Sequence, residues 1–205
     1  MTDPNAPRLF RLRCSYIERG RLAMLSHLEV AHALERTVRR AKLPFAVSQG
    51  FSPHMKISFG AALPVGVGST CEIFDIYLTR YVAPDAALDA LRAACVPDLM
   101  VQSCSYVDNK AAAASLAHPV STYEVIFDRD VAEIEVPISV EVVRKRKQKT
   151  LVVSDFLVQP FAVEGKRATF SLEAKETGSL RPDVLLAHCK VDAKIVSVTR
   201  IAQRS

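Results

Sequence analysis

Two histidines in the early part of the chain, His27 and His54, are the side chains best suited to acid–base chemistry or to holding an anion. His27 stands at the start of a predicted helix, where free backbone N–H groups and the helix dipole favour an anion. His54 follows a Gly-Phe-Ser-Pro turn that its proline stiffens. If folding brings the rings together, they could contact a phosphate or a base, or act as an acid–base pair. The alternative is a local helix-start residue and a packed loop residue.

Basic side chains surround these histidines in the sequence. Residues 1–56 hold ten Lys/Arg against four Asp/Glu, a balance of +6, whereas the whole chain carries +5. Cations along one helix face could neutralise phosphates, and a solvated helix face explains them almost as well. The residues predicted to line a contact surface with the two histidines are Arg36, Arg39, Arg40 and Lys56.

A second basic run places five cations in six residues, between two predicted strands. We expect it at a protruding β-hairpin tip or loop, where it could contact RNA or, alternatively, protect an edge strand. Its members are Arg144, Lys145, Arg146, Lys147 and, after Gln148, Lys149. Aromatic residues make up 7% of the chain, with no Trp and no RNP-type motif, so base stacking of the RRM kind is not expected.

Other chemistries find little support. The five cysteines are far apart and form no Cys-x-x-Cys, so we expect reduced, mostly buried thiols and no bound metal or cofactor. The glycine loop Gly66-Val67-Gly68-Ser69 precedes a strand instead of a helix, which excludes a P-loop. Glu72 and Asp75 are three apart on a strand and face opposite sides, which argues against a carboxylate dyad. No Ser-His-Asp or Cys-His set can be assigned from spacing.

The elements that must position these residues follow from periodicity and breakers. Ser26 and Glu29 form a predicted capping box at the start of a basic helix that Pro44 ends. The predicted order is strand 9–17, helix 26–42, short strands 45–48 and 56–61, strand 71–79, helix 84–95 and strand 99–107. This order is typical of the ferredoxin-like split βαβ fold.

The second half of the chain is richer in strands. A short helix is predicted over 110–117, strands over 123–127, 136–143, 151–158, 161–163 and 168–173, a helix over 181–189 and a last strand over 194–201. It could be a degenerate second copy with one helix missing or reduced. We therefore expect an α+β protein with a ferredoxin-like domain over 1–118, which carries the basic helix and the His loop, and a smaller strand-rich α+β subdomain over 119–205.

Composition is that of an ordinary globular protein, with 49% hydrophobic and 24% charged residues. No apolar run approaches 18 residues, so no transmembrane helix is expected. The start lacks the charged and apolar regions of a signal peptide, and a cytoplasmic location is the expectation.

Several of the same motifs carry a family resemblance. They are Leu25-Ser-His-Leu-Glu-x-x-x-x-Leu-Glu-Arg36, Arg39-Arg-Ala-x-Leu-Pro44, Ser48-Gln-Gly-Phe-Ser-Pro-His54, Ile57-Ser-Phe, Leu63-Pro-Val-Gly66, Glu72-x-x-Asp75 and the later Gly178-Ser-Leu-Arg-Pro-Asp183. With them the chain resembles the radical SAM-linked (radical SAM-associated) bacterial protein family, whose function is unknown. The match is strongest from about Arg8 to Leu78.

The resemblance implies an accessory role. Members occur as separate chains or fused behind a radical SAM protein with a cobalamin-binding-type domain, often encoded near an E/G-type ribonuclease and ribosomal proteins. This chain has no Cys-x-x-x-Cys-x-x-Cys and cannot itself carry the radical SAM cluster. The ferredoxin-like pattern is also similar to repeat-associated RNA-processing endonucleases, in fold only.

Three functions follow as hypotheses. The leading one is a non-catalytic partner of a radical SAM enzyme that binds or presents an RNA-linked substrate, such as tRNA or rRNA. The second is a metal-independent RNA-processing endonuclease or other hydrolase using His27 and His54. The third is a protein-binding module whose basic helix docks on an acidic face of its partner.

Overall fold

A computed structural model describes residues 9–144, 147–175 and 178–204. The chain divides into two compact units. Leu63–Thr70 and the chain from Ala117 onward form the second unit, and the remaining described residues form the first. The segment Leu63–Thr70 therefore belongs to a different unit from the residues on either side of it, which the sequence did not predict.

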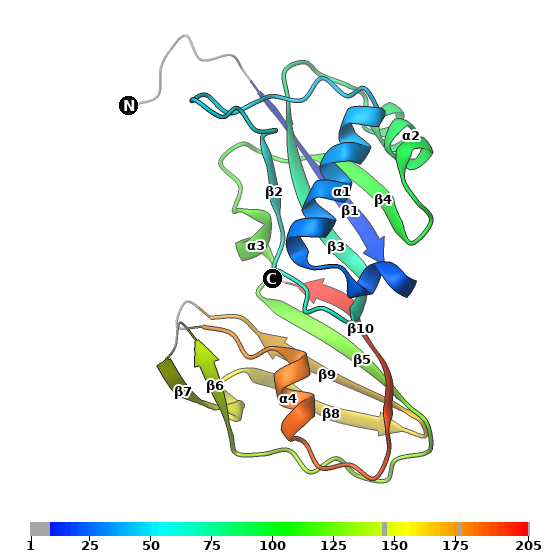
Figure 1. Cartoon of the computed structure of the whole chain (residues 1–205), viewed down its shortest axis with the longest axis vertical. Helices are drawn as coiled ribbons and strands as arrows, with labels where there is room; N and C mark the ends of the chain where they lie inside the picture. The colour runs from blue at the N-terminus through cyan, green and yellow to red at the C-terminus, as the bar shows by residue number, and fades with distance from the viewer. Residues whose placement is uncertain (1–8, 145–146, 176–177, 205) are drawn as a thin grey trace. The chain divides into compact units, whose positions relative to one another are not determined.

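The first unit is a ferredoxin-like α+β fold (Figure 1). Its elements are β1 (Phe10–Glu18), η1 (Gly20–Met24), α1 (His27–Arg40), β2 (Ile57–Phe59), β3 (Val67–Leu78), α2 (Pro84–Ala94), β4 (Leu99–Tyr106) and the short α3 (Ala114–Ala117). The strand order is β4-β1-β3-β2, with β4 antiparallel to β1 and β2 antiparallel to β3. This order confirms the predicted split βαβ pattern.

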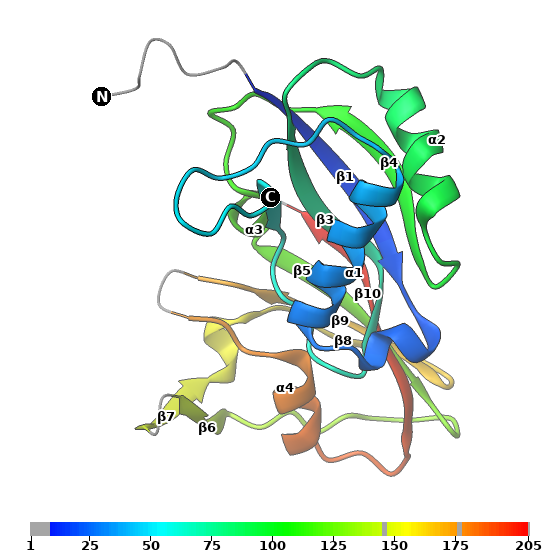
Figure 2. The same ribbon diagram turned by 45° about the horizontal axis from the view of Figure 1, so that its top comes forward.

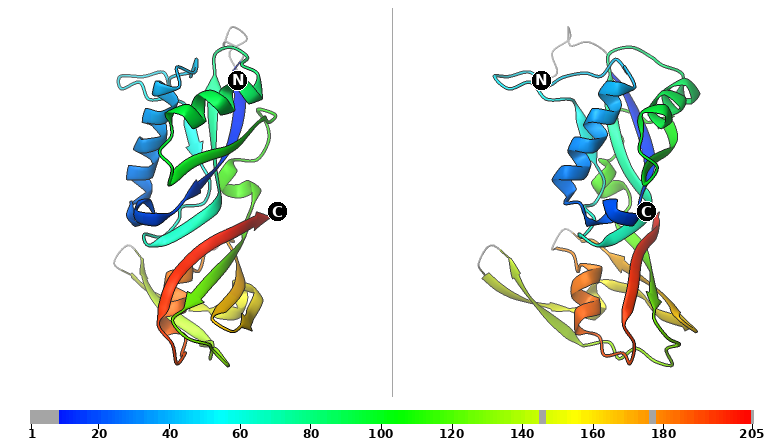
Figure 3. Two further views of the ribbon diagram at one scale, coloured as in Figure 1. Left: turned by 90° about the vertical axis from the view of Figure 1, so that its right-hand side faces the viewer. Right: turned by 45° about the vertical axis from the view of Figure 1, so that its right-hand side comes forward.

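Both long helices of the first unit cover the same face of its sheet (Figure 3). The strand alternation explains why, since every second residue of β1 is apolar and turns toward the helices. That core contains Leu12, Cys14, Tyr16, Val30, Leu34, Val38, Phe74, Ile76 and Leu91. The intervening residues of β1, including Arg11 and Arg13, lie on the helix-free face. Among the described residues, no helix is long and apolar enough to cross a membrane.

The second unit repeats the same strand order with one replacement. Its elements are β5 (Val120–Phe127), β6 (Ser139–Arg144), β7 (Lys147–Val152), η2 (Val153–Asp155), β8 (Leu157–Glu164), β9 (Arg167–Glu173), α4 (Pro182–His188) and β10 (Ile195–Arg204). The order β10-β5-β9-β8 corresponds to β4-β1-β3-β2, but every neighbouring pair is antiparallel, including the central β5–β9 pair, which would be parallel in a split βαβ unit. In chain order the β6–β7 hairpin takes the place of α1 between the first two strands of the second unit's sheet, so this half shares the strand order of the first unit and not its crossover (Figure 2).

The first residues of β3 complete the second unit. Val67, Gly68 and Ser69 pair in parallel with Val198, Thr199 and Arg200 of β10. The side chain of Val67 is buried in the second unit's core. We predicted a glycine loop here and a strand only from Cys71; pairing with β10 extends the strand to Val67 instead.

Three further sequence predictions were wrong at their boundaries. Of the short strands predicted over 45–48 and 56–61, only Ile57–Phe59 is a strand, because Phe45 and Val47 form isolated bridges. The strand predicted over 151–158 is interrupted by the η2 turn. Helix α3 covers only the last four residues of the helix predicted over 110–117.

Candidate functional site

Helix α1 positions the basic residues that the sequence singled out. Its start is fixed by the capping box, in which Glu29 N–H donates to Ser26 Oγ at 3.4 Å and Ser26 N–H donates to Glu29 Oε2 at 2.8 Å. The Ser26 hydroxyl also donates to Glu29 Oε2 at 2.7 Å, and this hydrogen bond, followed by the one from the Ser26 backbone N–H, lowers the pKa of Glu29. With the apolar side of α1 in the core, its solvent side presents a cationic stripe of exposed residues. The stripe consists of Arg36 and Arg39, with Lys42 just beyond the end of the helix; the exposed His32 lies on the same side.

The three arginines of α1 differ in what they touch. Arg36 is exposed and forms no hydrogen bond or ion pair with the described residues. Arg39 Nη2 lies 3.8 Å from Glu35 Oε2, and its Cζ lies 6.0 Å from the centre of the Phe45 ring. Arg40 instead donates from Nη2 to Ala94 O at 2.6 Å, which ties α1 to the end of α2. Arg36 and Arg39 therefore remain available to a ligand, whereas the Arg40 guanidinium already has a structural contact.

The loop of residues 48–54 extends from the end of α1 that carries Arg39. An isolated bridge between Val47 and Met55 closes its base. Ser48 N–H donates to His54 O at 2.7 Å, and His54 N–H donates to Ser48 Oγ at 3.0 Å. Phe51 at the tip is fully exposed. The backbone of His54 is thus fixed while its side chain is exposed, so the loop is a closed and solvent-facing structure.

His27 and His54 lie at opposite ends of α1. His27 is the first residue of the helix, and its ring packs edge-to-face on Phe59 with 5.6 Å between centroids. The loop that carries His54 joins the other end, and a 14-residue helix is about 20 Å long. The structure therefore does not bring the two rings together as a pair.

Lys56 lies between the loop and β2. Its backbone N–H donates to Ala46 O at 2.7 Å, and its Nζ lies 5.9 Å from the centre of the Tyr77 ring. Tyr77 belongs to β3 and also receives the Arg11 guanidinium at 5.9 Å. The Lys56 ammonium and the Arg11 guanidinium both interact favourably with this ring. Because Tyr77 and Arg11 lie on the helix-free face, the charge of Lys56 is on the opposite side of the sheet from α1.

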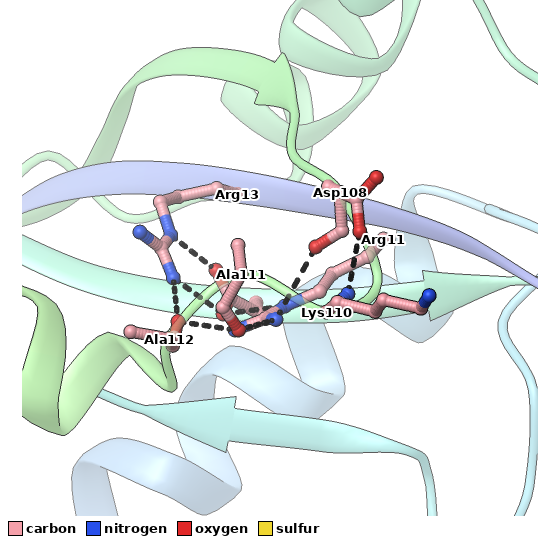
Figure 4. Close-up of polar contacts among 7 residues, drawn as sticks. Arg11, Arg13, Asp108, Lys110, Ala111 and Ala112 are labelled. Atoms are coloured by element: carbon pink, nitrogen blue, oxygen red, sulfur yellow. Dashed lines mark hydrogen bonds and ion pairs between the residues drawn. The ribbon is translucent and has the colours of Figure 1, made fainter.

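An arginine clamp on the helix-free face was missed by the sequence analysis (Figure 4). Asp75 is fully buried; its Oδ2 accepts from Arg11 Nη2 at 2.7 Å, and its Oδ1 accepts from Arg13 Nε at 2.8 Å. Arg11 also donates to the carbonyl oxygens of Ala111 and Ala112, at 2.7 and 2.9 Å. The hydrogen bond to Asp75 raises the pKa of Arg13.

The arginine clamp, defined as Arg11, Arg13 and Asp75, has a structural role. Its two guanidinium groups donate hydrogen bonds to the Asp75 carboxylate and to backbone carbonyl oxygens of the segment after β4, which holds that segment on the helix-free face of the sheet. A carboxylate in the middle of an apolar strand was the signal that could have indicated it, because buried charges are paired.

A pair of thiols faces the core from adjacent strands. Cys14 and Cys104 are directly opposite on β1 and β4, with their Sγ atoms 3.4 Å apart. The hydrogen bond between them, together with burial, raises the pKa of Cys14 well above its usual value. The same bond lowers the pKa of Cys104, with help from the nearby Arg92 guanidinium. The two thiols thus differ in acidity although they touch.

The second basic run lies in the β6–β7 hairpin. Arg144 pairs with Lys147 across the hairpin, which agrees with the predicted location, while Lys145 and Arg146 lie outside the described residues. A groove of about 380 Å³ separates β6 from α4. Its cation Arg181 is already paired with Asp183, with 2.5 Å between Nη2 and Oδ2, so this guanidinium is neutralised.

No metal site is present in the described part of the chain, where no three His, Cys, Asp or Glu side chains are placed to hold an ion. The fold and the surface define an α+β protein of two units, the first of them ferredoxin-like, with an exposed cationic helix face beside a closed loop. A family model for an uncharacterized protein conserved in bacteria (DUF2344) matches residues 11–184, and the chain belongs to this family. No curated protein matches the chain significantly.

Proposed function

We propose that the protein is an accessory, non-catalytic partner of a radical SAM enzyme that binds RNA and holds an RNA-linked substrate for it. The RNA-binding part of this proposal is supported by the cationic stripe. Arg36 and Arg39 are exposed on one helix face and Lys42 follows them. Lys56, which the sequence grouped with them, instead lies over Tyr77 on the helix-free face and is not part of the stripe. Cations arranged along a surface neutralise successive phosphates and release their counterions.

The separation of His27 and His54 supports binding over catalysis. A general acid and a general base must both reach the reacting atoms, within hydrogen-bond distance or through one water. His27 packs on Phe59, and the nearly extended chain from His54 to Phe59 separates the two rings, so they do not meet that condition. The competing endonuclease or hydrolase would need a different second group. Incubating the pure protein with total RNA, with and without divalent ions, tests it; cleavage that a His54→Ala variant loses while binding RNA normally would favour it.

The radical SAM part of the proposal rests on the family resemblance and on the missing cluster cysteines. Capture of tagged protein from native lysate of the source bacterium, with and without nuclease, tests it. A radical SAM protein retained in both samples is the expected result. Its absence from both would contradict the partnership. Loss of its capture when Arg36 and Arg39 are replaced would favour the protein-docking alternative for the stripe.

The RNA part is tested by fluorescence anisotropy with tRNA and rRNA fragments at two salt concentrations. The double variant Arg36→Ala, Arg39→Ala should bind about tenfold more weakly and reduce the salt slope by roughly one to two. The matched control is Arg129→Ala, Arg167→Ala, which removes two exposed arginines of the second unit and the same net charge. Equal losses of RNA affinity for both double variants would show that overall charge causes the effect, and would exclude the stripe as the RNA-binding surface.

A further inference from the structure

An aromatic pocket is present in the first unit, near the end of α1 that carries the cationic stripe. Tyr81 follows β3 and stacks on Tyr106 of β4, with 5.1 Å between centroids and 27° between planes. Phe10 of β1 packs edge-on against both rings, at 6.0 and 6.2 Å. The pocket has a volume of about 320 Å³, and its lining also includes Asp108 and Asn109.

The pocket is rigid on one side and open on the other. Tyr106 Oη accepts from Val82 N–H at 3.1 Å and donates to Val82 O at 2.8 Å, which fixes its ring. Tyr81 rests on that ring, yet 58% of its surface is exposed. A stacked ring held in place with so much surface in water is a platform on which another flat aromatic group can stack.

Hydrogen bonds tie the pocket to the stripe within the first unit. Phe45, which lies under Arg39, forms a bridge with Leu78 at the end of β3. Thr79 N–H donates to Pro44 O at 2.8 Å, and Tyr81 follows two residues later. The strand end that presents Tyr81 is therefore held beside the chain that leaves α1.

The cationic stripe and the aromatic pocket differ in charge, and each suits a different part of a nucleotide. The stripe offers cations to phosphates, whereas the pocket wall carries the carboxylate of Asp108 and the amide of Asn109. Asp108 Oδ1 accepts from Lys110 N–H at 2.7 Å and Asn109 Nδ2 donates to Leu9 O at 3.0 Å, so the second carboxylate oxygen of Asp108 is the acceptor offered to a base. Arg11 also lines the pocket, but it is engaged by Asp75 and by backbone carbonyls. A carboxylate repels a phosphate and accepts hydrogen bonds from the amino group of a base.

We infer that the aromatic pocket takes an unpaired nucleobase of single-stranded RNA, stacked on Tyr81, while the cationic stripe holds neighbouring phosphates. The inference rests on the proposed function and narrows its substrate class to RNA with exposed bases. It differs from stacking on the face of a sheet, because the platform lies at the strand ends of the unit.

The test compares two labelled single-stranded oligoribonucleotides of equal length and charge, one with bases and one with abasic sugars throughout. Anisotropy titrations of the full-length protein should give tighter binding of the base-bearing strand. Tyr81→Ala should reduce that preference by about tenfold, since base–aromatic stacking is worth about 1–3 kcal/mol. Tyr81→Phe, which keeps the ring, should preserve it. Phe51→Ala is the matched control, as it removes an exposed ring outside the pocket.

The outcomes separate this inference from the proposed function. Equal binding of both strands by the wild type, or an unchanged preference in Tyr81→Ala, overturns the pocket and leaves RNA binding in place. A preference lost in Phe51→Ala and kept in Tyr81→Ala also overturns it. No binding of either strand by folded wild-type protein refutes both ideas. Thermal melts check that each variant is folded. We expect both to fold, because the replaced rings are exposed.

Discussion

At the scale of single residues, Asp75 is a fully buried carboxylate that pairs with two arginines of the first unit. One fully buried carboxylate receives two guanidinium groups, and one of these groups also binds the backbone after β4. Removing the carboxylate would leave two cations on the helix-free face without their shared anion. Removing one partner of a buried ion pair strongly destabilises the folded protein, because the remaining charge stays desolvated.

Asp75→Asn should therefore lower the free energy of unfolding by roughly 3–5 kcal/mol. Urea unfolding followed by circular dichroism measures the change. The control is Asp98→Asn, which removes the exposed Arg19–Asp98 pair with side chains 64% and 47% exposed and should cost below about 1 kcal/mol. Similar costs for both variants would contradict a stabilising role for the arginine clamp.

The thiols should react in an order set by their pKa values. Alkylation requires the thiolate, so Cys104, whose pKa is lowered, should be labelled by iodoacetamide at pH 8 before Cys14 and Cys189. Burial raises the pKa of Cys189 to about 11, so its labelling should increase only as the pH approaches that value. Peptide mass spectrometry of timed samples measures the order, with urea-unfolded protein as the control. Labelling of Cys189 as fast as Cys104 at pH 8 would contradict it.

At the scale of elements, the start of α1 depends on the reciprocal bonds between Ser26 and Glu29. Ser26→Ala should lower the free energy of unfolding by about 1 kcal/mol at pH 7, and the melting temperature of a chain this size by roughly 2–4 °C. Glu29 has a lowered pKa in the folded state, so its contribution is present above its unfolded pKa and is lost as the pH falls through its folded pKa.

The difference in melting temperature between wild type and Ser26→Ala should therefore shrink between pH 5 and pH 3, which calorimetry at several pH values measures. Thr70→Ala serves as a control hydroxyl removal on an exposed strand position. A difference that stays constant over this pH range would argue against the carboxylate's share in the cap.

Local signals predicted most elements of the first unit, and pairing over long sequence distances decided what they missed. The capping box and the apolar stripe located α1, and Pro84 located the start of α2. The glycines before Cys71 indicated a loop. The local sequence gives no sign that Val67–Ser69 pairs with β10, so the start of β3 was missed. The candidate site followed the same rule. The exposed face of α1 was predicted from helical spacing, whereas the separation of the two histidines and the aromatic pocket depend on strand order.

At the scale of the whole molecule, the two units cannot be separated by one cut in the chain. Leu63–Thr70 belongs to the second unit although it lies inside the sequence of the first. Ser69 Oγ donates to Arg200 O at 3.3 Å, and Val67 is buried in the second core. A boundary near residue 118 thus removes a strand from the second unit.

A fragment of residues 117–205 should consequently unfold at a lower temperature, or less cooperatively, than the intact protein. Circular dichroism melts and amide proton dispersion by NMR measure this. A synthetic peptide of residues 61–72 added in trans should restore cooperative unfolding, and a peptide of the same composition in scrambled order is the control. A fragment that melts cooperatively without any peptide would show that the parallel pairing is dispensable.

The parallel pairing of β3 with β10 also determines how long the start of β3 lacks its partner during synthesis on the ribosome. Ser69 and Arg200 are 131 positions apart, and translation adds about 5–20 residues per second. The nascent chain therefore carries the leading residues of β3 without their partner for on the order of ten seconds. A premature stop codon at or before position 198 would permanently deprive Val67–Ser69, the leading residues of β3, of this partner.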